Sequence, residues 1–68
     1  MTYDYEILEH LGTVGNKALK IVKWGNGQPK YDLRQWRYGE DGLMMPGKGV
    51  TLTKQEAKEL MELLAACQ

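Results

Sequence analysis

The chain is too short to bury a large hydrophobic core, and it cannot cross-link itself. A domain of 68 residues buries only about 60% of the surface that its unfolded chain exposes, which leaves it marginally stable alone. Small domains gain the missing stability from disulfides, a metal ion or a second subunit. The single cysteine, Cys67, excludes an internal disulfide and cannot hold zinc by itself. We therefore expect one domain, residues 1–68, without metal or cofactor, that is completed by forming a homodimer.

The N-terminal segment, MTYDYEILEH, carries no basic stretch followed by an apolar run, so it does not resemble a secretory signal. No other part of the chain approaches the roughly 18 consecutive apolar residues that a membrane span needs. We therefore expect a cytoplasmic protein in a reducing environment, with no membrane partner.

The charges cancel over the whole chain but not along it. Nine basic and nine acidic residues balance, which by itself argues weakly against a nucleic-acid partner. Residues 14–48, however, carry seven Lys or Arg against three Asp or Glu, a difference of 7 − 3 = +4. Residues 1–13 carry acidic charges only, and residues 49–68 carry two Lys against three Glu. The middle of the chain is therefore a basic segment between acidic ends.

Alternating apolar and polar residues predict four strands. The predicted strands are residues 3–11, where Tyr3, Tyr5 and Ile7 alternate with acidic residues, and residues 18–24, 30–36 and 43–52. Pro29 opens the third strand, where its missing N–H does no harm, and Pro46-Gly47 is expected to interrupt the fourth. Glycine-rich segments predict turns at residues 12–16, 25–27 and 39–42.

A helix is predicted from residue 54 nearly to the end of the chain. Thr53 and Glu56 fit the T-x-x-E capping box, in which each side chain satisfies a free amide of the other residue. The apolar positions of this helix cover an arc of roughly 200°, about twice what a helix needs to cover its own sheet. We expect the excess to contact the helix of a second copy, through Ala57, Leu60, Met61 and Leu64. A helix that wraps deeply into its own core is the alternative.

One face of the third strand combines cations with an aromatic ring. Opposite Tyr31 and Leu33, alternation places Lys30, Asp32, Arg34 and Trp36. Single-stranded nucleic acid requires this combination, because bases stack on aromatic rings while cations follow the phosphates. Asp32 is expected to orient Lys30 or Arg34. The alternative is that the tryptophans belong to the core and the lysines form a solvated face.

Other motifs are weaker. Residues 42–49, GLMMPGKG, match the P-loop spacing, but Gly49 replaces the Ser or Thr that would hold Mg²⁺. Residues 22–26, VKWGN, resemble the start of a cold-shock domain, to which a C-terminal helix does not belong. His10 has no Cys or carboxylate partner at a metal-ligand or catalytic spacing, so we expect a surface or sheet residue. We therefore expect no enzymatic activity and no small-molecule substrate.

Three segments occur together in an order that resembles one family: PKYDLRQW at 29–36, PGKGVTLT at 46–53 and EAKELMELL at 56–64. Over residues 19–64 the chain is similar to the C-terminal domain of the transcriptional coactivator positive cofactor four (PC4), and still more to its short bacterial YdbC-type relatives. The resemblance implies four antiparallel strands, one helix and a dimer joined through the helices. It also implies a positively charged surface that holds single strands, or melted duplex, with little sequence preference.

The sequence thus predicts an α+β fold, a four-stranded antiparallel curved sheet followed by one C-terminal helix (ββββα), in a helix-mediated homodimer. The expected function is non-catalytic, nucleoid-associated binding of single-stranded DNA in transcription regulation, replication or repair. A protein-interaction module and a single-stranded RNA binder of cold-shock-like character remain alternatives. The candidate nucleic-acid-binding residues are Lys20, Lys23, Trp24, Lys30, Arg34, Trp36, Arg37 and Lys48.

Overall fold

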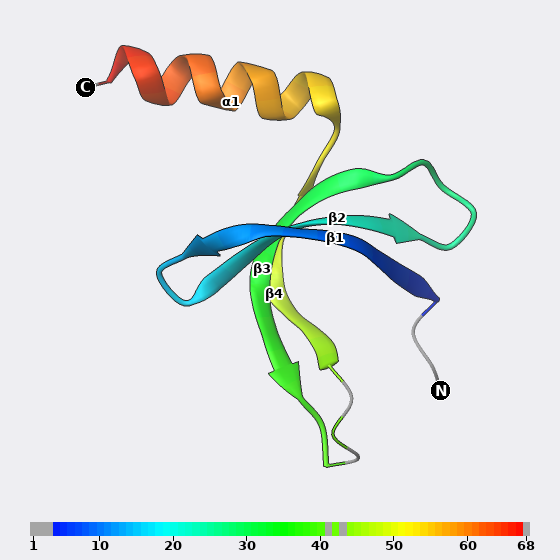
Figure 1. Ribbon diagram of the computed structural model, residues 1–68. Helices are drawn as coiled ribbons and strands as arrows, with labels where there is room; N and C mark the ends of the chain where they lie inside the picture. The colour runs from blue at the N-terminus through cyan, green and yellow to red at the C-terminus, as the bar shows by residue number, and fades with distance from the viewer. Residues whose placement is uncertain (1–3, 41, 43, 68) are drawn as a thin grey trace.

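The computed structural model describes residues 4–40, 42 and 44–67, which form one antiparallel sheet followed by one helix (Figure 1). The elements are β1 (Tyr5–Val14), β2 (Lys17–Trp24), β3 (Lys30–Tyr38), β4 (Met44–Leu52) and α1 (Lys54–Ala66). The strands lie in the order β1-β2-β3-β4, and each pairs with its neighbour in the chain. The predicted ββββα order is confirmed. Tyr3 and residues 41 and 43, to which the predicted strands and turns extended, lie outside the described residues.

The first turn is shorter than predicted. Residues 12–16 were expected to form it, but β1 continues through Gly12 to Val14, and only Gly15 and Asn16 make the turn, with a φ of 61° at Gly15. The register of β1 against β2 shifts twice, between Ile7 and Glu9 and between His10 and Gly12. Such bulges bend a strand. Gly12 therefore lies in a bent strand, and the prediction that it begins the turn was wrong.

The fourth strand is not interrupted at Pro46-Gly47, as the sequence had suggested. It is continuous from Met44 to Leu52 and contains a bulge instead. Arg34 pairs with Gly49 and Trp36 with Pro46, so two residues of β4 lie opposite the single residue Gln35 of β3. The extra residue explains how a proline and two glycines are accommodated within a paired strand.

The packed interior lies on the face of the sheet that is turned away from α1. Two residues there, Val22 and Asp32, are fully buried although no helix covers them. The sheet curls so far that its two edge strands meet: the Tyr5 hydroxyl of β1 donates a hydrogen bond to the Met44 carbonyl of β4. We call this side the inner face; it carries Tyr5, Lys20, Val22, Trp24, Asp32, Arg34 and Trp36.

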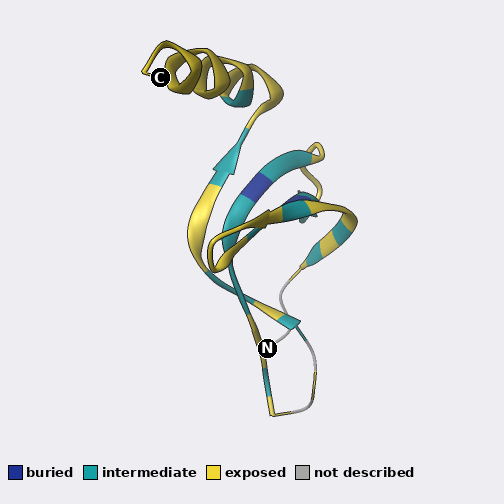
Figure 2. Cartoon of the chain, turned by 60° about the vertical axis from the view of Figure 1, so that its left-hand side comes forward, coloured by how far each residue is buried: buried dark blue, intermediate teal, exposed yellow. Residues whose placement is uncertain are grey.

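The helix α1 stands away from the sheet and buries none of its residues (Figures 1 and 2). The predicted capping box is present: the Thr53 side chain accepts a hydrogen bond from the Glu56 amide, and the Glu56 carboxylate accepts one from the Thr53 amide. The alternative of a helix wrapped into its own core is excluded by this exposure. Within the described residues, no helix has the length and apolar character needed to cross a membrane.

An apolar groove of about 680 Å³ separates α1 from the other face of the sheet. We call it the helix groove; its lining includes Leu19, Leu33, Leu52, Ala57, Leu60, Met61 and Leu64. The radius of gyration, 13.1 Å, exceeds the roughly 11 Å expected of a compact chain of this length. The four predicted dimer-contact residues of α1 therefore all face an unfilled space within an extended protomer.

Candidate nucleic-acid interface

Three aromatic rings form a cluster on the inner face. The Tyr5 ring lies between the two indoles, with its centroid 5.4 Å from that of Trp24 and 5.7 Å from that of Trp36. Both indole rings are half-buried, and among the described residues neither Nε1 has a hydrogen-bond partner. The sequence predicted tryptophans displayed on an open surface. The structure partly encloses them instead, because the curled sheet brings β1 against the ends of β2 and β3.

A cation lies over each indole. The Arg34 guanidinium carbon is 5.1 Å from the Trp24 ring centroid, and the Lys20 ammonium is 5.7 Å from that of Trp36. Both distances lie within the range of cation–π attraction. Lys20 is only 7% exposed, and its Nζ lies 3.2 Å from Nδ1 of His10. The structure thus brings four of the predicted site residues together on one face.

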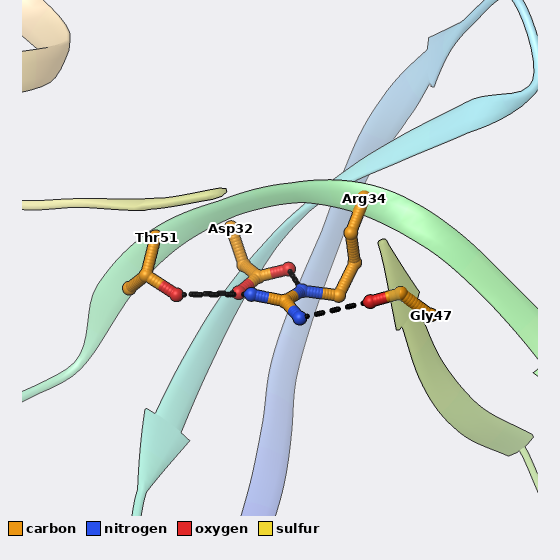
Figure 3. Close-up of polar contacts among 4 residues, drawn as sticks. All are labelled: Asp32, Arg34, Gly47 and Thr51. Atoms are coloured by element: carbon orange, nitrogen blue, oxygen red, sulfur yellow. Dashed lines mark hydrogen bonds and ion pairs between the residues drawn. The ribbon is translucent and has the colours of Figure 1, made fainter. Parts of the chain in front are cut away.

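A polar network ties Arg34 into the sheet (Figure 3). Its Nε donates to Oδ1 of Asp32, its Nη1 to the Gly47 carbonyl at 3.1 Å, and its Nη2 to the Thr51 hydroxyl at 3.2 Å. That hydroxyl donates in turn to the other carboxylate oxygen of Asp32 at 2.9 Å. A buried ion pair is stable only when further hydrogen bonds complete it, as they do here. The prediction that Asp32 orients a neighbouring cation is confirmed for Arg34.

The remaining predicted cations do not lie over the indole rings. Lys30 is half-buried at the start of β3, opposite Val22, on the inner face. Arg37 and Lys48 are exposed, Lys48 within the bulge of β4. Lys23 is paired with Glu6, and alternation along β2 places its side chain on the face opposite that of Trp24. The structure therefore does not bring Lys23 to the inner face.

The residues set aside as catalytic or metal-binding lie apart from one another. His10 is exposed on β1, as expected for a surface residue of the sheet, and Cys67 is exposed at the C-terminal cap of α1. Across residues 4–40, 42 and 44–67, no three His, Cys, Asp or Glu side chains lie close enough to hold a metal ion.

Tyr5 is the member of this site that the sequence pattern missed. Its alternation with Ile7 predicted a strand residue facing inward, but not its neighbours. Contact between β1 and β3 depends on how strongly the intervening strand curves, and no local pattern encodes that curvature. The one sequence feature that could have indicated this role is that Tyr5 is an aromatic residue near the end of a strand in a small sheet.

Comparison with known proteins gives two matches. A family model described as Transcriptional Coactivator p15 (PC4) matches residues 13–63. An uncharacterized protein of Treponema pallidum (strain Nichols) is 38% identical over 69 residues, covering 91% of this chain and 76% of that protein. No solved structure gives a significant match. The family match includes both indoles and the Asp32–Arg34 pair, but it begins after Tyr5.

Proposed function

The chain belongs to the family of the transcriptional coactivator p15 (PC4), and from this premise we propose that it is a non-catalytic protein that binds single-stranded DNA with low sequence specificity. Transcription regulation, replication and repair are the processes that we propose for it, in association with the nucleoid. The observation that carries the proposal is the position of both indoles beside cations on a curved face that α1 leaves uncovered.

The proposed contacts are stacking and electrostatic. Bases stack on the accessible parts of Trp24 and Trp36, while phosphates are neutralised by Lys30, Arg37 and Lys48 around them. Such binding tolerates many sequences, because every base has a flat π-face. A curved face also favours a single strand over a duplex, whose persistence length is about 50 nm.

Salt dependence tests the electrostatic part. Each phosphate neutralised on a single strand contributes about −0.7 to the slope of log K against log salt concentration. Titration of single-stranded DNA, duplex DNA and RNA of one sequence is expected to give the highest affinity for single-stranded DNA, with an affinity that falls as salt is added. Tighter binding of RNA would support the cold-shock-like alternative. The absence of salt-dependent binding to any of the three would refute the proposed function.

The Trp36→Ala variant tests the stacking part. We expect it to weaken single-stranded DNA binding by about 1–3 kcal/mol, which is roughly a five- to 150-fold loss of affinity. Because Trp36 also contacts Tyr5, affinity must be measured per folded molecule, by anisotropy of a labelled oligonucleotide alongside a thermal melt. Trp36→Phe is the matched control, since it keeps an aromatic ring for stacking and for the contact with Tyr5. Unchanged affinity of folded Trp36→Ala would remove Trp36 from the site.

We also propose that the protein is a homodimer in which the α1 helix of a second copy occupies the helix groove. The protomer exposes 5440 Å², whereas a monomeric protein of 7.8 kDa exposes about 4400 Å². The excess of about 1000 Å² is close to the roughly 800 Å² that each partner buries in a stable interface. The predicted contact residues Ala57, Leu60, Met61 and Leu64 line this groove.

The Leu60→Asp variant tests the dimer. A carboxylate placed in the helix groove would be buried without a partner on association, so we expect monomers in sedimentation velocity. Leu63→Asp is the matched control, because Leu63 is 66% exposed on the same helix and does not line the groove. A folded Leu60→Asp dimer would contradict the proposed interface.

A further inference from the structure

Arg34 uses three of its five guanidinium N–H groups within the sheet. All three of its nitrogen atoms donate hydrogen bonds within the sheet, to Asp32, Gly47 and Thr51 (Figure 3). Its side chain is 15% exposed, and that of its ion-pair partner Asp32 is fully buried. The two charges cancel at close range, so the pair adds little to the positive potential that a nucleic acid meets.

The same guanidinium lies beside the bulge of β4. Gly49 is the cross-strand partner of Arg34, and a Cβ at Gly49 would lie 1.9 Å from the Cβ of Arg34. A Cβ at Gly47 would lie 2.6 Å from the Gln35 carbonyl oxygen. Only glycine therefore permits so close an approach at either position. The PGKG segment contains the bulge and packs directly against the backbone of β3. Arg34 donates a hydrogen bond to the Gly47 carbonyl of this segment.

Between these two glycines lies Lys48, whose side chain is exposed. A lysine on a bulge is aimed by the backbone of that bulge, because the extra residue redirects its own side chain. The bulge in turn is held by the Arg34 bond to Gly47 on one side and, through Thr51, by the buried carboxylate on the other. Arg34 also lies over the Trp24 ring.

We propose that Arg34 is a positioning residue: it fixes the β4 bulge so that Lys48 meets the phosphate chain, and it is not itself a phosphate ligand. This inference rests on the proposed single-stranded DNA binding. In this proposal the charge of Arg34 stabilises the fold, and the charge of Lys48 binds the nucleic acid. It also gives the PGKG segment a role, as the support of a cation.

The test measures the salt slope of oligonucleotide binding for five variants of the full chain. Lys48→Gln is expected to reduce the magnitude of the slope by about 0.7, the contribution of one phosphate. Arg34→Lys keeps its charge but loses the three-way donor geometry, so we expect the same reduction of about 0.7. In the Arg34→Lys background, Lys48→Gln is expected to change the slope no further, since the contact is already lost.

Thr51→Val and Thr51→Ser form the control pair, and neither alters a charge. Thr51→Val removes the hydroxyl that joins Arg34 to Asp32 and is expected to lower the slope, whereas Thr51→Ser keeps it and is expected to match the wild-type slope. This pair decides the question if Arg34→Lys does not fold.

Two results would overturn the inference. If Arg34→Lys and Thr51→Val keep the wild-type slope, or if the effects of Arg34→Lys and Lys48→Gln simply add, Arg34 acts independently of Lys48. Wild-type binding persists in that case, and the proposed function stands. If the wild-type chain binds no single-stranded DNA, the proposed function fails and this role of Arg34 fails with it.

Discussion

Replacing Gly49 with alanine is expected to destabilise the domain by about 3 kcal/mol, the upper end of the usual cost of overpacking. The added Cβ would lie 1.9 Å from the Cβ of Arg34 and 2.4 Å from the Leu33 carbonyl oxygen. One of these obstacles is backbone, so no side-chain rotation relieves the clash, and the pairing of β3 with β4 must open. Urea denaturation followed by circular dichroism measures the loss. At about 0.05–0.15 kcal/mol per residue, a domain of 68 residues has a free energy of unfolding of about 3–10 kcal/mol, so this loss removes from about a third to nearly all of it.

Gly12→Ala is the matched control for this prediction. Gly12 also lies within a strand, but nothing lies within 4 Å of an added Cβ there. We expect a change of no more than about 0.5 kcal/mol, as for most substitutions that meet no neighbour. Similar denaturation midpoints for the two variants would show that β4 relaxes easily, and that the close approach of Gly49 to β3 is not a constraint on the fold.

Removal of the Asp32 carboxylate is the second large effect. Asp32→Ala is expected to cost about 3–5 kcal/mol, because it leaves the mostly buried Arg34 guanidinium without its counter-charge. It also takes the acceptor away from the Thr51 hydroxyl. The free energy of unfolding, measured by urea denaturation at neutral pH, reports the change directly.

Two further variants separate this cause from a general loss of charge. Glu9→Ala removes an exposed carboxylate from β1 and is expected to change stability by less than about 0.5 kcal/mol. The double variant Asp32→Ala/Arg34→Met removes both buried charges and is expected to recover much of the loss, since a matched apolar replacement of a buried ion pair is often nearly neutral. Equal effects of Asp32→Ala and Glu9→Ala would show that the Asp32–Arg34 network contributes nothing to the fold.

The elements of the fold that local patterns determine were predicted correctly. The start of α1 follows from Thr53 and Glu56, which are three residues apart and satisfy each other's amides. The second strand follows from its own apolar alternation, and β2 begins one residue before the predicted range. The first turn was misplaced because the bulges of β1 are defined only against β2. A glycine before a turn and a glycine inside a bent strand look alike in sequence.

For the candidate site, the sequence predicted which side chains share a face of β3, but not how they contact one another. Strand parity correctly separated Trp36 and Arg34 from Tyr31 and Leu33. It could not show that Arg34 is engaged by Asp32 and Thr51, because Thr51 belongs to another strand. Strand parity also could not predict that the Tyr5 ring lies between the two indoles. These contacts depend on register and curvature, which arise from the assembled sheet.

The division of the molecule into an inner face and a helix groove has a consequence for how the protein responds to its own concentration. Interior packing involves one side of the sheet, whereas the proposed subunit contact would engage only α1 and the opposite side. Dilution is therefore expected to separate protomers that each retain a folded cluster of rings. The avidity for long strands, which two protomers can bind together, would then rise with protein concentration. The affinity of one protomer for a short strand would not change.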